Sequence, residues 1–210
     1  MKNLEDFNSR KIGIGPMSSE VIEAVYKYSS INNKQLMLIA SKNQIDHNGG
    51  YVNNWNTKQY SNYLKDMQLK YVNARVKICR DHCGPGFNGN YNLKDVYKTI
   101  DSDIENNFDL IHVDFSKAKK NYKQILKLSK QAILYIKKTN PKVEIEIGTD
   151  ENFAQKLSSI NIKEFLDEMD YFLDFMDPEY FVVPTGSLVM EDKQFGFFNH
   201  KFIKSVYQRI

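Results

Sequence analysis

The sequence predicts one α/β domain that forms the larger part of a (β/α)8 barrel. Strand-like and helix-like hydrophobic patterns alternate six times along the 210 residues. The strand segment at 35–41 is apolar almost throughout, as in a parallel strand that is covered on both faces. Polar and glycine residues follow nearly every strand, and this pattern suits a barrel whose loops share one site.

The first half of the chain supplies three strands, each followed by a helix. The Ser18 hydroxyl can cap the first helix, and Glu20 lies in the first turn, where the helix dipole favours an acid. The second strand is apolar along its length, and the second helix carries its apolar residues at helical spacing. Strands are expected at 11–17, 35–41 and 75–79 or slightly further, with helices from 18, at 57–71 and at 93–106.

The second half repeats the pattern three more times. Asn140 and Pro141 end the fourth helix, and Asp177 and Pro178 follow the fifth. Gly148 directly follows the fifth strand. Strands are expected at 108–115, 143–147 and 180–183, with helices at 122–138, 162–176 and from about 199 to 210.

Alternating strands and helices imply parallel strands joined by right-handed crossovers. An open doubly wound sheet also fits, but it usually has one phosphate-binding glycine-rich turn after its first strand. Six units are two short of a barrel, which needs roughly 250 residues. An incomplete barrel exposes strand edges that another chain must cover, so we expect a homo- or hetero-oligomer.

Composition excludes several classes of protein. The net charge is +3, from 29 basic and 26 acidic residues, which argues against nucleic-acid and membrane partners. No apolar run reaches the roughly 18 residues of a membrane span, and the N-terminus lacks the apolar stretch of a signal peptide, so we expect a cytoplasmic protein. Cys79 and Cys83 are expected to be reduced thiols.

The most informative candidates are Asp81 and His82, at the end of the third strand. The carboxylate can move a proton, and the imidazole can bind a divalent metal. Adjacent strand residues face opposite ways, so the two are expected to have different roles. In the alternative interpretation, Asp81 caps the loop by accepting the N–H groups of Gly84 and Gly86.

Two further strands carry ionisable residues on one face. His112 and Asp114 alternate with apolar residues on the fourth strand, and Glu144 and Glu146 do so on the fifth. Glu146 lies nearer the carboxyl end and is the better site candidate, whereas Glu144 is expected to pair with a base such as Lys77.

Loop residues add weaker candidates for substrate binding. The amides of Asn43 and Gln44 and the backbone of Gly50 suit sugar hydroxyls or phosphate, and Thr185 with Gly186 forms a second possible phosphate cradle. His47 and His200 are expected at the surface. Trp55 either stacks on a sugar or packs its own loop.

These segments together resemble the Z-type subunits of D-tagatose-1,6-bisphosphate aldolase. The family's S-N-Q-V…G-G-Y, D-H-L-G-P, I-H-L-D, I-G-T-E and V-V-Q-P-G elements occur in the same order and with similar spacing. They match 39–45 with 49–51 (IASKNQI…GGY), 81–85 (DHCGP), 111–114 (IHVD), 147–150 (IGTD) and, more loosely, 182–186 (VVPTG).

The resemblance implies a TIM barrel related to the zinc-dependent class II aldolases. It implies that Asp81 is the acid/base, that His82 binds zinc and that Glu146 belongs to the site. The implied reaction is retro-aldol cleavage of a ketose bisphosphate. The family's second zinc-binding His has no counterpart within 185–190, and a third ligand would lie on a seventh strand.

Three functional hypotheses follow. In the first, which follows from the view that the Z-type subunits are non-catalytic, the chain is an aldolase-type subunit of sugar-phosphate metabolism that supports or completes a catalytic partner. In the second hypothesis it is a lyase in its own right. In the third it is a sugar-phosphate-binding or isomerase-like barrel without aldolase activity.

Overall fold

The sheet has six parallel strands in the order in which they occur in the chain, which is the strand order of a barrel. The computed structural model describes residues 12–148, 159–183, 187–190, 193–196 and 198–209. The strands of this sheet are β1 (Ile12–Ile14), β2 (Gln35–Ser41), β3 (Arg75–Cys83), β4 (Leu110–Val113), β5 (Glu144–Ile147) and β6 (Tyr180–Phe181).

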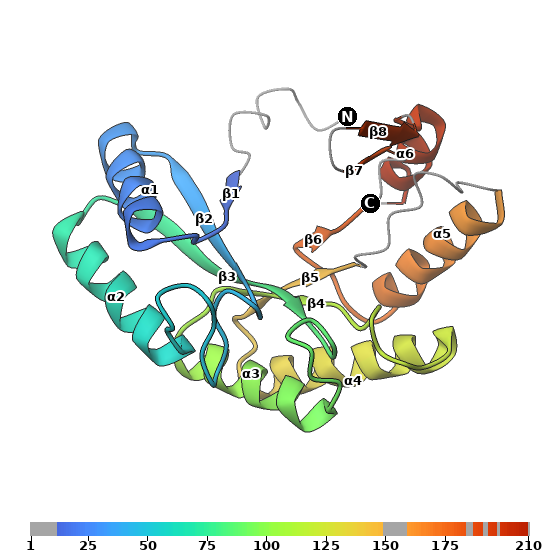
Figure 1. The fold of residues 1–210 in the computed structure, drawn as a ribbon. Helices are drawn as coiled ribbons and strands as arrows, with labels where there is room; N and C mark the ends of the chain where they lie inside the picture. The colour runs from blue at the N-terminus through green and yellow to red at the C-terminus, as the bar shows by residue number, and fades with distance from the viewer. Residues whose placement is uncertain (1–11, 149–158, 184–186, 191–192, 197, 210) are drawn as a thin grey trace.

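Helices follow the strands and lie around the outside of the curled sheet (Figure 1). They are α1 (Ser19–Asn32), α2 (Thr57–Lys70), α3 (Leu93–Glu105), α4 (Tyr122–Thr139), α5 (Ser159–Leu173) and α6 (His200–Tyr207). The Ser18 side chain caps α1 by accepting the Val21 N–H at 3.3 Å, as predicted. The prediction of a partial TIM-barrel-like α/β fold is therefore confirmed.

The segment after β6 differs from the prediction. It forms an antiparallel hairpin of β7 (Ser187–Met190) and β8 (Lys193–Gly196) before α6, and the sequence pattern predicted neither strand. Thr185 and Gly186, the predicted phosphate cradle, lie outside the described residues. The described helices include none that is both long and apolar enough to cross a membrane.

The two faces of the sheet have different chemistry. On the helix-covered face, Ile111, Val113 and Ile145 join a buried apolar cluster with residues of α3 and α4. On the opposite face, Lys77 pairs with Glu144, as predicted, and His112 lies beside Glu146 in the register of β4 and β5. This alternation turns one side chain in two on β4 and β5 toward the barrel interior.

Both cysteines are buried and carry free thiols. Cys79 lies on the interior face with Met37 and Leu110, whereas Cys83 packs into the cluster beneath α3 and α4. Burial raises the pKa of the Cys83 thiol to about 12, so this group stays protonated and inert at neutral pH.

A fully buried ion pair joins β3 to α3. Arg80 donates from Nε and Nη2 to the two carboxylate oxygens of Asp103, each at 2.7 Å. Its Nη1 donates to the carbonyls of Ala40 and Ile45, so the same side chain also holds the end of β2 and the loop that follows it. Neither Arg80 nor Asp103 is exposed to solvent.

We predict that Arg80→Met lowers the free energy of unfolding by about 3–5 kcal/mol, because it leaves the Asp103 charge buried without a partner. Urea denaturation followed by circular dichroism measures the change. Lys163→Met is the matched control, because its ion pair with Asp167 is exposed and should contribute less than about 1 kcal/mol. Arg80→Met with Asp103→Leu should recover much of the loss. Arg80→Met with the same stability as the native chain would contradict the prediction.

Candidate active site

The site forms where β3 bulges against β4. Arg80 pairs with Ile111 and Cys83 pairs with Val113, so two residues of β3, Asp81 and His82, lie opposite the single residue His112. His82 adopts a left-handed backbone with φ of 50°. The expectation that Asp81 and His82 face opposite ways is wrong for this reason, since the bulge turns both toward His112.

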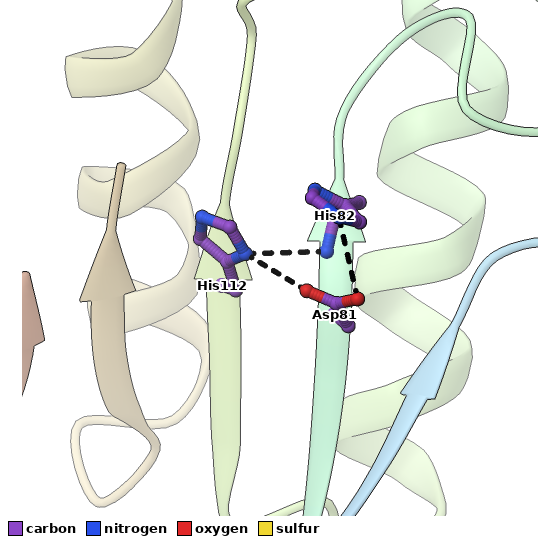
Figure 2. Close-up of side chains that lie close together, drawn as sticks. All are labelled: Asp81, His82 and His112. Atoms are coloured by element: carbon purple, nitrogen blue, oxygen red, sulfur yellow. Dashed lines mark hydrogen bonds and ion pairs between the residues drawn. The ribbon is translucent and has the colours of Figure 1, made fainter. Parts of the chain in front are cut away.

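Three side chains meet at the bulge (Figure 2). His112 Nδ1 lies 3.1 Å from Asp81 Oδ1, and His82 Nε2 lies 3.4 Å from Asp81 Oδ2. The backbone N–H of His82 donates to His112 Nδ1 at 3.3 Å. The side chains of Asp81 and His82 are 31% and 25% exposed, so a ligand can reach the cluster.

The alternative role of Asp81 as a loop cap does not fit the contacts. The N–H of Gly84 donates to the carbonyl of His82 at 2.9 Å, and the N–H of Gly86 donates to the carbonyl of Asn90 at 2.7 Å. The Asp81 carboxylate instead faces the two imidazoles. Burial acts to raise the pKa of Asp81, but the His112 hydrogen bond and the charge of His82 outweigh it, and the pKa is lowered.

The packing around His82 fixes the orientation of its ring. The fully buried Asp114 places Oδ2 3.0 Å from His82 Nδ1, and the Phe87 ring stacks on the imidazole at 4.5 Å between centroids. Gly84 permits this arrangement, because a Cβ there would lie 1.5 Å from the Asp114 carbonyl oxygen. The Asp114 carboxylate thus helps to hold the His82 ring in one orientation.

Glu146 extends the site to a third strand. It is the register partner of His112 across β4 and β5, and burial raises its pKa. The structure therefore places the predicted residues Asp81, His82, His112 and Glu146 in one row across β3, β4 and β5. Asp114 contacts His82 from outside that row.

The loop after β2 contains the other predicted binding residues. Gln44 is buried: its side chain accepts the N–H of Ser41 at 2.9 Å and contacts the Met17 sulfur. Gly50 lies against the Gln44 carbonyl, where a Cβ would clash at 2.1 Å. Asn43 is exposed. The contacts of Gln44 and Gly50 shape this loop.

The structure also decides the positions of Trp55 and His200. Trp55 packs on Tyr63, with 4.8 Å between ring centroids, so the indole holds down its own loop. His200 is exposed, as predicted, at the start of α6.

A buried polar network that the sequence did not predict lies between the loop after β2 and α3. Lys42 has a fully buried ammonium that donates to Asp95 at 2.9 Å and lies 3.8 Å from Asp46. His47 Nε2 contacts the other oxygen of Asp95 at 2.9 Å, and its side chain is 18% exposed, so His47 is half-buried and paired where a surface position was predicted. Thr99 donates to Asp46 at 2.7 Å.

This network is structural in character. The trio Asp46, His47 and Asp95 has metal-like spacing, but the Lys42 ammonium already supplies a positive charge between the two carboxylates. The only signal in the sequence was Lys42 itself, a lysine directly after an apolar strand, where a solvated side chain is the usual outcome.

We predict that Asp95→Asn lowers the free energy of unfolding at pH 7 by about 1.5–3 kcal/mol, because a buried lysine loses its charged partner. Burial acts to raise the pKa of Asp95, but hydrogen bonds from Lys42, His47 and Asn88 lower it to about 2. A depressed carboxyl pKa stabilises the fold above the unfolded value of roughly 4 and loses that effect as the pH falls toward 2.

The measurement is urea denaturation at several pH values between roughly 2 and 7. The difference between the native chain and Asp95→Asn should shrink as the pH falls below 4. Asp167→Asn, which removes an exposed carboxylate, is the control and should show little difference at any pH. A pH-independent difference would contradict the assigned role of Asp95.

Comparison with solved structures shows a TIM-barrel-like fold. A probable tagatose 6 phosphate kinase from Sinorhizobium meliloti 1021 superposes with a TM-score of 0.66 at 15% identity, covering 94% of this chain and 55% of that one. A fructose-bisphosphate aldolase from Campylobacter jejuni gives a TM-score of 0.64 at 13% identity, covering 97% and 63%.

The chain therefore spans a little more than half the length of these proteins. At such low identities the likeness establishes the fold alone. No protein-family model matches the sequence, and comparison with curated protein sequences finds no significant match.

Proposed function

We propose that this chain is an aldolase-like subunit of carbohydrate metabolism that binds a sugar phosphate at the carboxyl ends of β3, β4 and β5. The observation that carries the proposal is the row formed by Asp81, His82, His112 and Glu146. In TIM barrels the catalytic groups lie at this end of the strands. The resemblance to the tagatose-bisphosphate aldolase Z-type subunits supports the same substrate class.

The donor groups at the bulge fit a divalent metal such as zinc. In the neutral tautomer in which His82 Nδ1–H donates to Asp114 Oδ2, the Nε2 atom of His82 carries the lone pair that a metal needs. A carboxylate bonded to the far nitrogen of the imidazole is the usual support of a metal-binding histidine. A metal bound there would polarise the carbonyl of a ketose substrate.

The protein's own groups must then move one proton. In retro-aldol cleavage, a base takes the proton of the hydroxyl next to the scissile bond, and the electrons of that bond move toward the carbonyl. Asp81 and Glu146 are the carboxylates in reach of the site. The raised pKa of Glu146 brings it closer to the pH at which a carboxyl group can both accept and release a proton.

Several parts of the substrate site remain predictions. Thr185 and Gly186 are proposed to bind a phosphate group, and Asn43 is proposed to reach a sugar hydroxyl from its exposed loop. We also propose that the chain works as a homo- or hetero-oligomer in the cytoplasm, and that a catalytic aldolase subunit is one candidate partner. Strand edges of a partial barrel favour such an assembly.

We predict that the purified chain, supplied with zinc, cleaves tagatose or fructose bisphosphate, and that Glu146→Gln slows turnover by about 10²–10⁴-fold, the contribution of a general acid or base. A coupled assay follows the dihydroxyacetone phosphate released through NADH oxidation. Glu105→Gln, which changes an exposed carboxylate at the end of α3, is the control and should leave turnover unchanged.

The assay also separates the alternatives. Thermal protection of the folded chain by either bisphosphate, without cleavage, would support a sugar-phosphate-binding barrel. Turnover that appears only after addition of a catalytic aldolase subunit would support the accessory role. Neither cleavage nor protection, alone or with that subunit, would contradict the proposed function.

A further inference from the structure

We infer that Asp81, His82 and His112 together ligate one divalent transition-metal ion, so that β3 and β4 supply all three protein ligands. This deepens the proposed function by naming the ligand set of its metal, although the metal-binding test below does not depend on aldolase activity. The resemblance assigns a ligand role only to His82.

Distances within the cluster suit a shared ion. One ligand atom from each of the three residues can be chosen so that all lie within 4.8 Å of one another. Asp81 Oδ1 lies 3.1 Å from His112 Nδ1, and Asp81 Oδ2 lies 3.4 Å from His82 Nε2. Two atoms that each lie roughly 2.0–2.1 Å from a tetrahedral zinc are about 3.4 Å apart. Small shifts of the side chains can therefore admit the ion.

His112 Nδ1 faces the centre of the cluster. It lies 3.1 Å from Asp81 Oδ1 and 3.3 Å from the backbone nitrogen of His82. A metal ion bound there would replace the proton of the His112–Asp81 hydrogen bond, because a ligating imidazole nitrogen must be unprotonated.

The far side of the His112 ring is closed to solvent. The ring is 2% exposed, and its Nε2 has no hydrogen-bond partner among the described residues. Nδ1 is therefore the ring nitrogen that faces the other two candidate ligands, Asp81 and His82.

The cluster also has a supporting carboxylate and a side that is open to solvent. Asp114 Oδ2 lies 3.0 Å from His82 Nδ1 and is fully buried, as the supporting carboxylate of a metal-binding histidine should be. The partial exposure of Asp81 and His82 leaves a side open for a substrate atom, and catalytic zinc sites commonly have three protein ligands and an open position. With Asp81 on the metal, Glu146 is left to move the proton.

The second group of residues with metal-like spacing differs from the cluster at the bulge, because a lysine already occupies it. Asp46, His47 and Asp95 have similar spacing, but the Lys42 ammonium lies 2.9 Å from Asp95 and 3.8 Å from Asp46. A cation there would have to displace a buried lysine. The prediction is therefore specific to the bulge of β3.

The test is metal binding by the full chain after dialysis against a chelator. Co²⁺ titration followed by its visible absorption, together with equilibrium dialysis against Zn²⁺, should give one ion per chain. His112→Gln, His82→Gln and Asp81→Asn should each weaken binding by at least about 100-fold, and Asp114→Asn by about 10–100-fold. His47→Gln and His200→Gln are controls that should bind like the native chain.

Circular dichroism and thermal unfolding must show that each variant is folded, and His112→Asn provides a second variant if His112→Gln is not. A folded native chain that binds no metal would overturn the inference, and so would His112→Gln with native affinity. Metal binding without cleavage or sugar-phosphate binding would uphold the ligand set while contradicting the proposed function. Cleavage by a folded chain that binds no metal would uphold the proposed function while contradicting the ligand set.

Discussion

The buried pair of Arg80 and Asp103 is the interaction on which the site depends. Arg80 is the last residue of β3 that pairs regularly with β4 before the bulge. Its guanidinium holds α3 through Asp103 and the end of β2 through two backbone carbonyls. A residue anchored on three sides cannot slide along the sheet, so the irregularity falls on the next two residues, Asp81 and His82.

The bulge converts an ordinary strand end into a site. In a regular strand, neighbouring side chains alternate between the faces, and only one of Asp81 and His82 would reach His112. The left-handed backbone of His82 has an energetic cost for a residue that is not glycine. Stacking on Phe87 and the contact with Asp114 offset that cost and fix the ring orientation.

The sequence predicted the architecture well because its signals are periodic. Alternating apolar patterns identified all six strands and six helices of the main fold, and the alternation on β4 and β5 correctly separated interior from helix-facing residues. The bulge has no periodic signature, so the shared direction of Asp81 and His82 could not be predicted. The buried Lys42 was also missed, since its partner Asp95 is 53 residues away.

The position of the candidate ligands bears on how a partial barrel can act. The chain spans 55% and 63% of the two structures it resembles, and a barrel site is normally shared by loops from all strands. Here the candidate ligands come from adjacent strands, β3 and β4, and Glu146 comes from the next. The proposed metal binding and proton transfer would therefore need only the central strands of the sheet. Phosphate binding and closure of the barrel would fall to further segments of this chain or of a partner.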